Sequence, residues 1–276
     1  MYHASRWRLA LNQAFLITWA IVSLLPLIWM FSASLQTNQE IYAGLKLIPT
    51  APQWSNYSQA WSMSDFGTYF MNSLFYTVAT VVGTILISSM AAFGFAWLKI
   101  PGKEIFYYAF LFLLMMPIPG QFVPLFLVLV KLGLADTRLG YVLVLINSSL
   151  AVSIFLLRGY MESVPKALEE AARIDGASTL MLYWRIMMPL CRPALATITI
   201  FTALSAWNEL VLALIIFSDR SKLPVQAGLM IFQGTYLTRF DLMMAATTIA
   251  TIPVILMYVV AQRSIIKSVM AGAVKG

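Results

Sequence analysis

Charged side chains gather between Arg158 and Arg192 in a chain that is otherwise strongly apolar. These 35 residues hold nine of the chain's 29 charged side chains: Arg158, Glu162, Lys166, Glu169, Glu170, Arg173, Asp175, Arg185 and Arg192. Acids and bases interleaved in this way can form ion pairs with complementary charges on another protein. The pattern indicates a surface on which another protein docks.

The first half of this stretch has the signals of a short helix. Pro165 suits a first helical turn, where a missing amide hydrogen costs little. Glu169 and Arg173 lie one helical turn apart, in the order that slightly favours a helix, and Gly176 can take the left-handed conformation that ends one. Small side chains would leave a shallow face that another protein could approach closely: Ala171, Ala172, Gly176 and Ala177.

A second helix is predicted directly after Gly176. Ser178 can cap its N-terminus, and the helix would run through Tyr183 to about Met188 and stop at Pro189. We therefore expect a helical hairpin, broken at Gly176, in the polar stretch between two apolar segments.

A second group of side chains, Trp207, Asn208 and Glu209, lies within a long apolar run. A carboxylate inside a membrane-spanning helix is costly, and by default it faces a water-filled cavity or a paired partner. Trp207 offers an aromatic face, and the Asn208 amide both donates and accepts hydrogen bonds, a combination that can hold a sugar. The alternative is that Trp207 packs against another helix and that Glu209 pairs with an arginine of another subunit.

The segments that position both groups must lie in lipid. Hydrophobic residues make up 61% of the chain and charged residues only 11%, whereas a soluble domain has about 25% charged residues. A spanning helix needs roughly 20 predominantly apolar residues, and there are six candidates: about Leu9–Phe31, Phe70–Trp97, Phe106–Val130, Leu139–Leu157, Pro193–Phe217 and Met243–Val260. We predict an all-α, polytopic membrane protein with six transmembrane helices in a single domain, residues 1–276.

The distribution of lysine and arginine predicts the orientation. With both termini inside, the inside loops hold twelve of these residues and the outside loops hold six, and the richer side is the cytoplasmic one. The charged hairpin would then lie in the cytoplasm. The net charge of +7 is read as this topology signal, together with attraction to anionic lipid, and not as a nucleic-acid surface.

The residues of common catalytic and metal sites are scarce. His3 is the single histidine and Cys191 the single cysteine, so neither a metal cluster nor an internal disulfide is predicted. A membrane enzyme would need a nucleophile with a base, or a metal site. The sequence has no Gly-x-x-x-x-Gly-Lys-Ser/Thr phosphate loop. No catalytic residue is predicted.

The charged stretch resembles the cytoplasmic loop of bacterial ABC-importer permeases, and more narrowly the shorter six-span subunit of the maltose-type carbohydrate importers. The resemblance rests first on Glu170-Ala171-Ala172, Asp175-Gly176-Ala177, Tyr183, Ile186 and Pro189. It extends along nearly the whole chain through Ala92-Phe93-Gly94-Phe95-Ala96, Ile100-Pro101-Gly102-Lys103, Trp207-Asn208-Glu209 and the tail Ala271-Gly272-Ala273-Val274-Lys275-Gly276. Tyr183 stands where phenylalanine is usual.

The resemblance implies a transmembrane permease subunit of an ATP-driven importer in a bacterial inner membrane. Its partners would be a second permease subunit in a heterodimer, two ATPase subunits that carry ATP and magnesium, and an extracytoplasmic solute-binding protein. This chain would hold no cofactor. The loop of about residues 158–192 would dock on the ATPase through Glu170, Ala171, Ala172, Asp175, Gly176, Ala177 and Pro189.

The resemblance also assigns roles to two other segments. The external connection Ser218–Leu242 would meet the binding protein, and the tail of residues 271–276 would insert between the ATPase subunits. By their residue types, and not by the resemblance, Trp207, Asn208 and Glu209 are predicted to line the translocation path. An oligosaccharide is the expected solute, with glycerol phosphate or a polyol as the alternative. A secondary transporter, which usually has internal repeats, and a membrane enzyme explain the hairpin less well.

Two polar patterns within the spans leave alternatives open. Hydroxyl side chains follow one face of the second span and either pack by bonding to a helix or line a path: Thr77, Thr80, Thr84 and Ser88. Pro117, Pro119 and Pro124 interrupt the third span, which predicts either a tolerated kink or a helix broken near a cavity.

Overall fold

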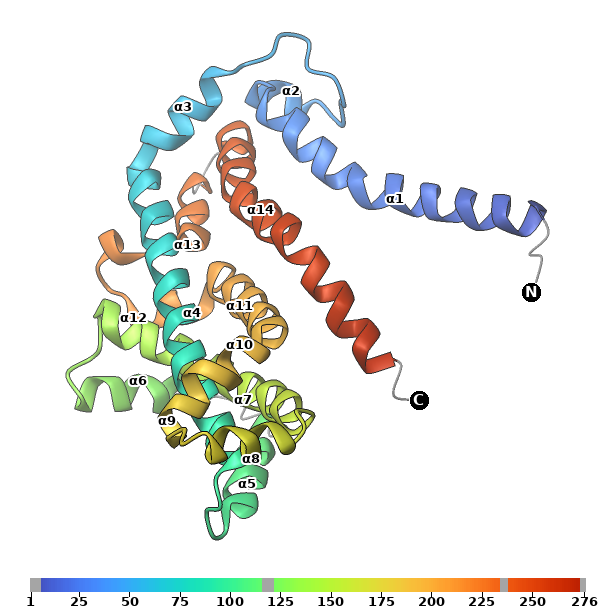
Figure 1. Cartoon of the computed structure of the whole chain (residues 1–276). Coiled ribbons are helices and arrows are strands. Elements are labelled where there is room, and N and C mark those ends of the chain that lie inside the picture. Colours follow the sequence, from blue (N-terminus) through green and yellow to red (C-terminus); the bar gives the residue numbers. More distant parts are fainter. Residues whose placement is uncertain (1–5, 116–121, 234–237, 274–276) are drawn as a thin grey trace. The chain divides into compact units, whose positions relative to one another are not determined.

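The computed structural model describes residues 6–115, 122–233 and 238–273. Within those ranges every regular element is helical, as the all-α prediction requires (Figure 1). The α-helices are α1 (Arg6–Ser34), α2 (Asn38–Tyr42), α3 (Ser55–Ser62), α4 (Phe66–Trp97), α5 (Lys103–Met115), α6 (Phe122–Lys131), α7 (Arg138–Glu162), α8 (Ala167–Ile174), α9 (Thr179–Met181), α10 (Met188–Leu190), α11 (Arg192–Trp207), α12 (Val211–Ile216), α13 (Val225–Leu229) and α14 (Phe240–Ala273). A π-helical segment, Leu182–Met187, joins α9 to α10, and short 3₁₀ turns lie at Met63–Asp65, Arg220–Lys222 and Met230–Phe232.

Four helices in the described ranges are long and apolar enough to cross a membrane: Leu11–Ser34, Phe66–Trp97, Arg138–Glu162 and Phe240–Val260. A fifth candidate is the pair Thr179–Leu190 and Arg192–Trp207, which is bent by 75°. The chain is therefore a helical protein with several apolar spans.

The fifth predicted span is not a single continuous helix, and the third is described only in part. In the third, α5 has 13 residues and α6 has 10, while residues 116–121, including Pro117 and Pro119, lie outside the described residues. Pro124 is the third described residue of α6. The fifth contains α11 and α12, which are separated at residues 208–210. Six spans therefore stay a prediction.

The chain divides into two compact units by its internal contacts. One contains residues 1–67 and 228–252, and the other contains residues 68–227 and 253–276. In the first unit, the Asn56 amide donates hydrogen bonds to the carbonyls of Ser34 and Gln36 at 3.0 and 2.9 Å, and the Asn38 side chain bonds both Thr238 and Phe240. These bonds order the connection after α1, which contains two short helices.

Two buried clusters hold the second unit together. One surrounds Tyr76 and Tyr141, whose ring centroids are 4.8 Å apart. The other joins α4, α7, α11 and the 172–191 region through buried side chains such as Phe93 and Leu157. Between the clusters Gly83 lets α4 approach α7, because a β-carbon there would collide with the side chain of Ile146.

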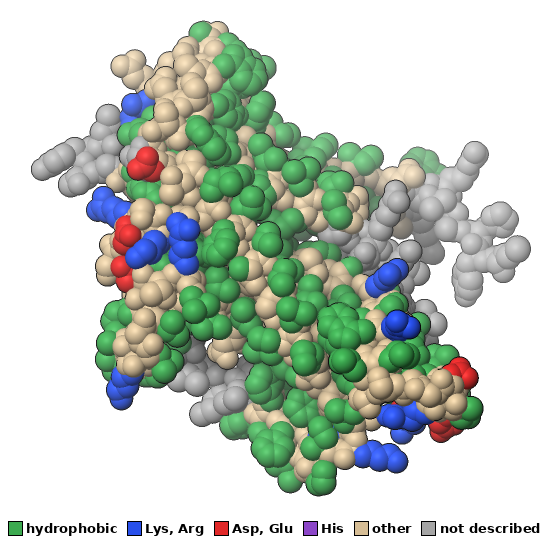
Figure 2. Space-filling view, turned by 60° about the vertical axis from the view of Figure 1, so that its left-hand side comes forward, with side chains coloured by type: hydrophobic (Ala, Val, Ile, Leu, Met, Phe, Trp, Pro, Cys, Tyr) green, Lys and Arg blue, Asp and Glu red, His purple; other side chains and the backbone are tan. Residues whose placement is uncertain are grey.

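Large hydrophobic side chains are widely exposed on the chain. Figure 2 shows broad areas of hydrophobic side chains with the charged ones gathered in small groups. In α1, no residue of the most apolar 18-residue window is buried inside the chain. Exposure on this scale is unfavourable in water, so it supports the prediction that these helices contact lipid or other subunits.

Candidate functional site

The helix α8 begins and ends through local signals. The N-terminal cap of α8 is Lys166, so Pro165 precedes the helix instead of lying in its first turn. The carbonyl of Pro165 accepts a hydrogen bond from the Leu168 amide at 3.1 Å. At the other end Gly176 has a φ of +80°. The amide of Ala177 donates to the Ala172 carbonyl at 2.9 Å, which completes a glycine-terminated helix end. The predicted break at Gly176 is confirmed.

The second helix of the hairpin begins where predicted but ends later. The Ser178 hydroxyl accepts from the Met181 amide at 3.2 Å and caps α9. Pro189 does not stop the helix, which continues to Leu190 and ends at Cys191. The π-helical segment Leu182–Met187 precedes Pro189 and shifts the pattern of backbone hydrogen bonds. The helix can therefore accommodate Pro189, which has no amide hydrogen.

One side of the hairpin packs against the ends of α4 and α7. Tyr183 is 4% exposed, and its ring meets the edge of Phe93 with centroids 5.4 Å apart. Its hydroxyl lies 2.7 Å from the Ser89 hydroxyl on α4. Ala172 and Met187 are buried in the same cluster, together with Leu157 of α7. The buried side of the hairpin is therefore packed against both long helices.

The opposite side of the hairpin is open. Most of the predicted docking residues are exposed there: Glu170, Ala171, Asp175, Gly176 and Pro189. Ala177 is half-buried, and Ala172 is only 8% exposed. Ala172 therefore supports the hairpin from inside because its small side chain fits against the core of this chain. Docking itself stays a prediction.

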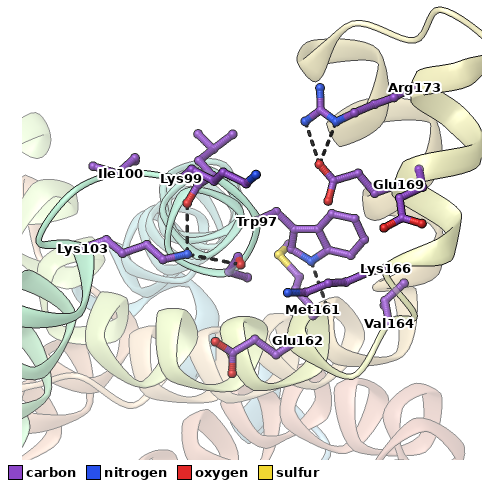
Figure 3. A pocket seen from close by; sticks show the side chains of 13 residues that line it. Trp97, Lys99, Ile100, Lys103, Met161, Glu162, Val164, Lys166, Glu169 and Arg173 are labelled. Atoms are coloured by element: carbon purple, nitrogen blue, oxygen red, sulfur yellow. Dashed lines mark hydrogen bonds and ion pairs between the residues drawn. The ribbon is translucent and has the colours of Figure 1, made fainter.

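A cavity of about 940 Å³ lies beside α8, between the hairpin, the end of α7 and the loop after α4. Figure 3 shows the Trp97 indole directed at the Met161 carbonyl, to which it donates at 3.0 Å, and the paired Glu169 and Arg173 on α8. The closest atoms of that ion pair are 2.7 Å apart, as the sequence predicted. Lys103 donates to the Leu98 carbonyl at 3.0 Å and so fixes the loop.

Arg158 has a different place from the one expected in a surface loop. Its side chain is 9% exposed, lies within α7, and forms ion pairs at 2.7 Å with both Glu104 of α5 and Glu162. The guanidinium also lies 3.7 Å from the centroid of the Tyr107 ring, at a distance that gives a cation–π interaction. Arg158 therefore joins α5 to α7. Spacing along the chain gave no signal for the pairing with Glu104, which is 54 residues away.

The group Trp207, Asn208 and Glu209 lies at the break between α11 and α12. Trp207 is 1% exposed, and its ring meets the edge of Phe70 with centroids 5.4 Å apart. Asn208 is exposed, and its amide oxygen accepts from Gln226 at 3.2 Å. Glu209 is half-buried. This arrangement fits the alternative in which Trp207 packs against another helix. Asn208 and Glu209 are the two residues of the group that are accessible enough to line a translocation path.

A cavity of about 350 Å³ adjoins this break. Its polar lining consists of Glu209 together with Asn147 and Ser148 from the middle of α7. The hydroxyl stripe on α4 is separate from this lining. Its members are buried within the chain, and their hydroxyl oxygens have no hydrogen-bond partner among the described residues: Thr77, Thr80, Thr84 and Ser88.

Comparison with known proteins identifies the family. Residues 84–270 match the binding-protein-dependent transport system inner membrane component family. The chain belongs to this family. The matched region includes the hairpin, both cavities and the break in the fifth predicted span.

Three relatives extend the match over almost the whole permease. The chain is 31% identical over 265 residues to the diacetylchitobiose uptake system permease protein of Streptomyces coelicolor, covering 95% of this chain and 88% of the relative. It is 32% identical to the trehalose transport system permease protein of Mycobacterium tuberculosis, covering 92% and 93%. A chain in the crystal structure of a bacterial ABC transporter involved in the import of the acidic polysaccharide alginate is 30% identical, with a TM-score of 0.83 and coverage of 95% and 98%. The chain is a multi-pass membrane permease.

Sequence reasoning missed the groups that face Glu209. Asn147 and Ser148 are polar residues in the middle of the predicted fourth span. Polar side chains at that position could have been recognised from the sequence as candidate site residues. Their relation to Glu209 is visible only in the fold, because Asn147 and Glu209 are 62 residues apart along the chain (209 − 147).

Proposed function

We propose that this permease is one half of a heterodimeric pore in an ATP-driven importer of a carbohydrate. Two separate ATPase subunits, which bind ATP and magnesium, and an extracytoplasmic binding protein would complete the importer. The chain would lie in a bacterial inner membrane with both termini in the cytoplasm. The solutes named for its relatives, diacetylchitobiose, trehalose and alginate, support a carbohydrate over glycerol phosphate or another polyol.

The observation that carries this proposal is the two-sided hairpin. Its exposed side presents Glu170 and Asp175, and its buried side is attached to α4 through Tyr183 and Ser89. When the ATPases close on ATP, a docked hairpin would move and carry the spans with it. This coupling would alternate access to the solute path between the two sides of the membrane.

The outer end of the permease would receive the binding protein. Lys222 donates to the Asp136 backbone carbonyl at 2.8 Å and pairs with its carboxylate at 3.1 Å. The Tyr76 hydroxyl donates to the Lys222 carbonyl at 2.7 Å. These bonds hold the start of the external segment against α4 and the α6–α7 connection, which supports its role as a platform for a partner.

The docking role is tested by substitutions on the exposed side of the hairpin. Glu170→Ala and Gly176→Leu should uncouple ATP hydrolysis from solute uptake in the copurified importer. Gly133→Leu is the matched control, because Gly133 also has a positive φ, +68°, and no neighbouring atom that a β-carbon would meet. Both leucine variants should carry similar strain, on the order of 1–2 kcal/mol. Wild-type uptake in the hairpin variants, or equal losses in both leucine variants, would contradict docking at Gly176.

The solute class is tested with the same complex. ATPase activity should rise with at least one oligosaccharide when the importer and its binding protein are supplied together. Stimulation by glycerol phosphate alone would assign the alternative. No stimulation by any carbohydrate would reject carbohydrate import while leaving the docking result unaffected.

A further inference from the structure

The fifth predicted span is interrupted in its interior, and the break is stabilised by a carboxylate. Helix α11 ends at Trp207, and α12 begins at Val211. The Glu209 carboxylate accepts the Leu212 amide at 2.9 Å, so one of the backbone groups freed by the break is satisfied from within the chain. Irregular backbone at membrane depth is tolerated where it is buried in protein or lines a water-filled cavity.

A cavity is present at this break. It measures about 350 Å³, and its polar lining comes from Asn147, Ser148 and Glu209. Ser148 donates to the Val144 carbonyl at 3.0 Å, so its hydroxyl oxygen retains the capacity to accept. Together these three side chains offer a charged acceptor, an amide that donates and accepts, and a hydroxyl. The rest of the lining is apolar: Phe122, Leu125, Val144, Val211 and Leu212.

The cavity lies near the middle of α7, a helix long and apolar enough to cross a membrane. Asn147 is the tenth residue of the 25-residue helix α7, so it lies roughly 14 Å from the start of that helix at 1.5 Å per residue. The hydrocarbon core of a bilayer is about 30 Å thick. Asn147 is therefore about half of that thickness from the start of α7, whichever end of the helix faces the cytoplasm.

Glu209 gives the cavity a negative charge that the described part of the chain does not neutralise with an ion pair. The ion pairs found in that part involve Arg158, Arg173, Lys222 and Arg239, and none includes Glu209. A carboxylate near the membrane midplane that lacks a basic partner requires water or a polar ligand. Like charges repel in such a site because the apolar walls of the cavity focus the field of the carboxylate.

We propose that this cavity is a solute subsite that takes the hydroxyl groups of an uncharged carbohydrate and rejects carbohydrates with carboxylate groups. The proposal rests on the proposed function and adds the charge class of the solute. Neighbouring sugar hydroxyls donate to Glu209, and the Asn147 amide both donates to and accepts from them. A uronic-acid carboxylate in the same place faces Glu209 and is repelled.

The field of the cavity is measurable without knowing the natural solute. Cys191, the single native cysteine, is buried, so Asn147→Cys introduces one accessible thiol into the assembled importer. A cationic methanethiosulfonate should modify this thiol at least tenfold faster than an anionic one of similar size. Adding Glu209→Gln should bring the two rates within about threefold of each other, because glutamine removes the charge and still accepts the Leu212 amide. Ser148→Cys repeats the test if Asn147→Cys fails to assemble, and Val152→Cys on α7 is the control outside the cavity lining.

Protection of the thiol tests the solute class. Trehalose, as a neutral probe, should slow modification of Asn147→Cys at least threefold, and an alginate oligosaccharide should not. Equal rates for the two reagents without Glu209→Gln would show that a partner's cation neutralises Glu209, and no modification by either would show a cavity closed to water. Either result, or equal protection by the two carbohydrates, overturns the proposal. None of these results bears on ATPase stimulation by carbohydrate, so the proposed function is judged separately.

Discussion

The hydrogen bond between Tyr183 and Ser89 provides a sharp test of how the hairpin is held. The Ser89 hydroxyl also donates to the Ile85 carbonyl of its own helix. Because a serine hydroxyl has one proton, the Tyr183 hydroxyl must be the donor in the bond to Ser89. Tyr183→Phe removes that donor and leaves the ring contact with Phe93 in place.

In this structure, the stability lost through Tyr183→Phe should be at the low end of the range for removing a hydrogen bond from buried polar groups. Ser89 keeps its bond to Ile85, so no buried proton is left without an acceptor. The change should therefore cost about 1 kcal/mol, the net value of one neutral hydrogen bond. At room temperature that raises the equilibrium for local opening about fivefold. The ring's burial should be unaffected because phenylalanine fills nearly the same volume.

Hydrogen exchange in the purified complex measures this effect directly. Amides of residues 179–190 should exchange about fivefold faster in Tyr183→Phe, while amides in the middle of α7 should not change. Tyr160→Phe is the control, since Tyr160 is half-buried beside the same cluster and its hydroxyl has no hydrogen bond among the described residues. Adding Ser89→Ala to Tyr183→Phe should produce little further change through this bond. A difference below about 1.5-fold in Tyr183→Phe, or an equal effect of Tyr160→Phe, would refute this account of the hairpin.

Two further predictions concern the outer platform and the tail. The hydrogen bond from Lys222 holds the pKa of Asp136 below its usual value, and backbone amides that donate to the same carboxylate lower it further. A carboxyl group whose pKa is lowered by folding stabilises the folded state at pH values above its unfolded pKa. That stability is lost as the pH falls through the folded pKa. Acidification below about pH 4 should therefore speed hydrogen exchange in residues 218–225. Asp136→Asn should reduce this pH dependence and leave the part due to Asp219, whose pKa is also lowered, mainly by hydrogen bonds from Ser221 and also by Lys222. A profile unchanged by Asp136→Asn would assign the whole dependence to other groups. Deleting residues 271–276 should reduce the coupling of ATP hydrolysis to uptake if the tail enters the ATPase pair, whereas unchanged coupling would favour an ordinary free terminus.

Helix ends in the hairpin were predictable because they depend on neighbouring residues. Gly176 ends α8 in a left-handed conformation, and Ser178 caps α9, both as expected from residue type alone. Pro189 was misjudged because its effect depends on the π-helical segment that precedes it. A π turn replaces the usual pairing four residues apart with pairing five residues apart, and the sequence carried no local signal for that change.

Segment length and composition determined the spans only in part. The apolar content predicted a helical membrane protein, and four long apolar helices agree with it. The same content did not reveal that the span over residues 193–217 breaks after Trp207. An apolar run reports the preference for lipid, whereas a break depends on whether another group satisfies the freed backbone, as Glu209 does for Leu212.

By itself, the sequence determined that the chain is helical and that it enters lipid, and it predicted a charged hairpin on which a partner would dock. These properties follow from residue type and short-range spacing, which act along a single segment. The tertiary structure decided which groups face each other. It buried Trp207 against Phe70, paired Arg158 with Glu104, and placed Asn147 and Glu209 on the lining of one cavity. Such contacts join residues far apart in the chain, so they depend on how the helices pack and have no signature in local periodicity.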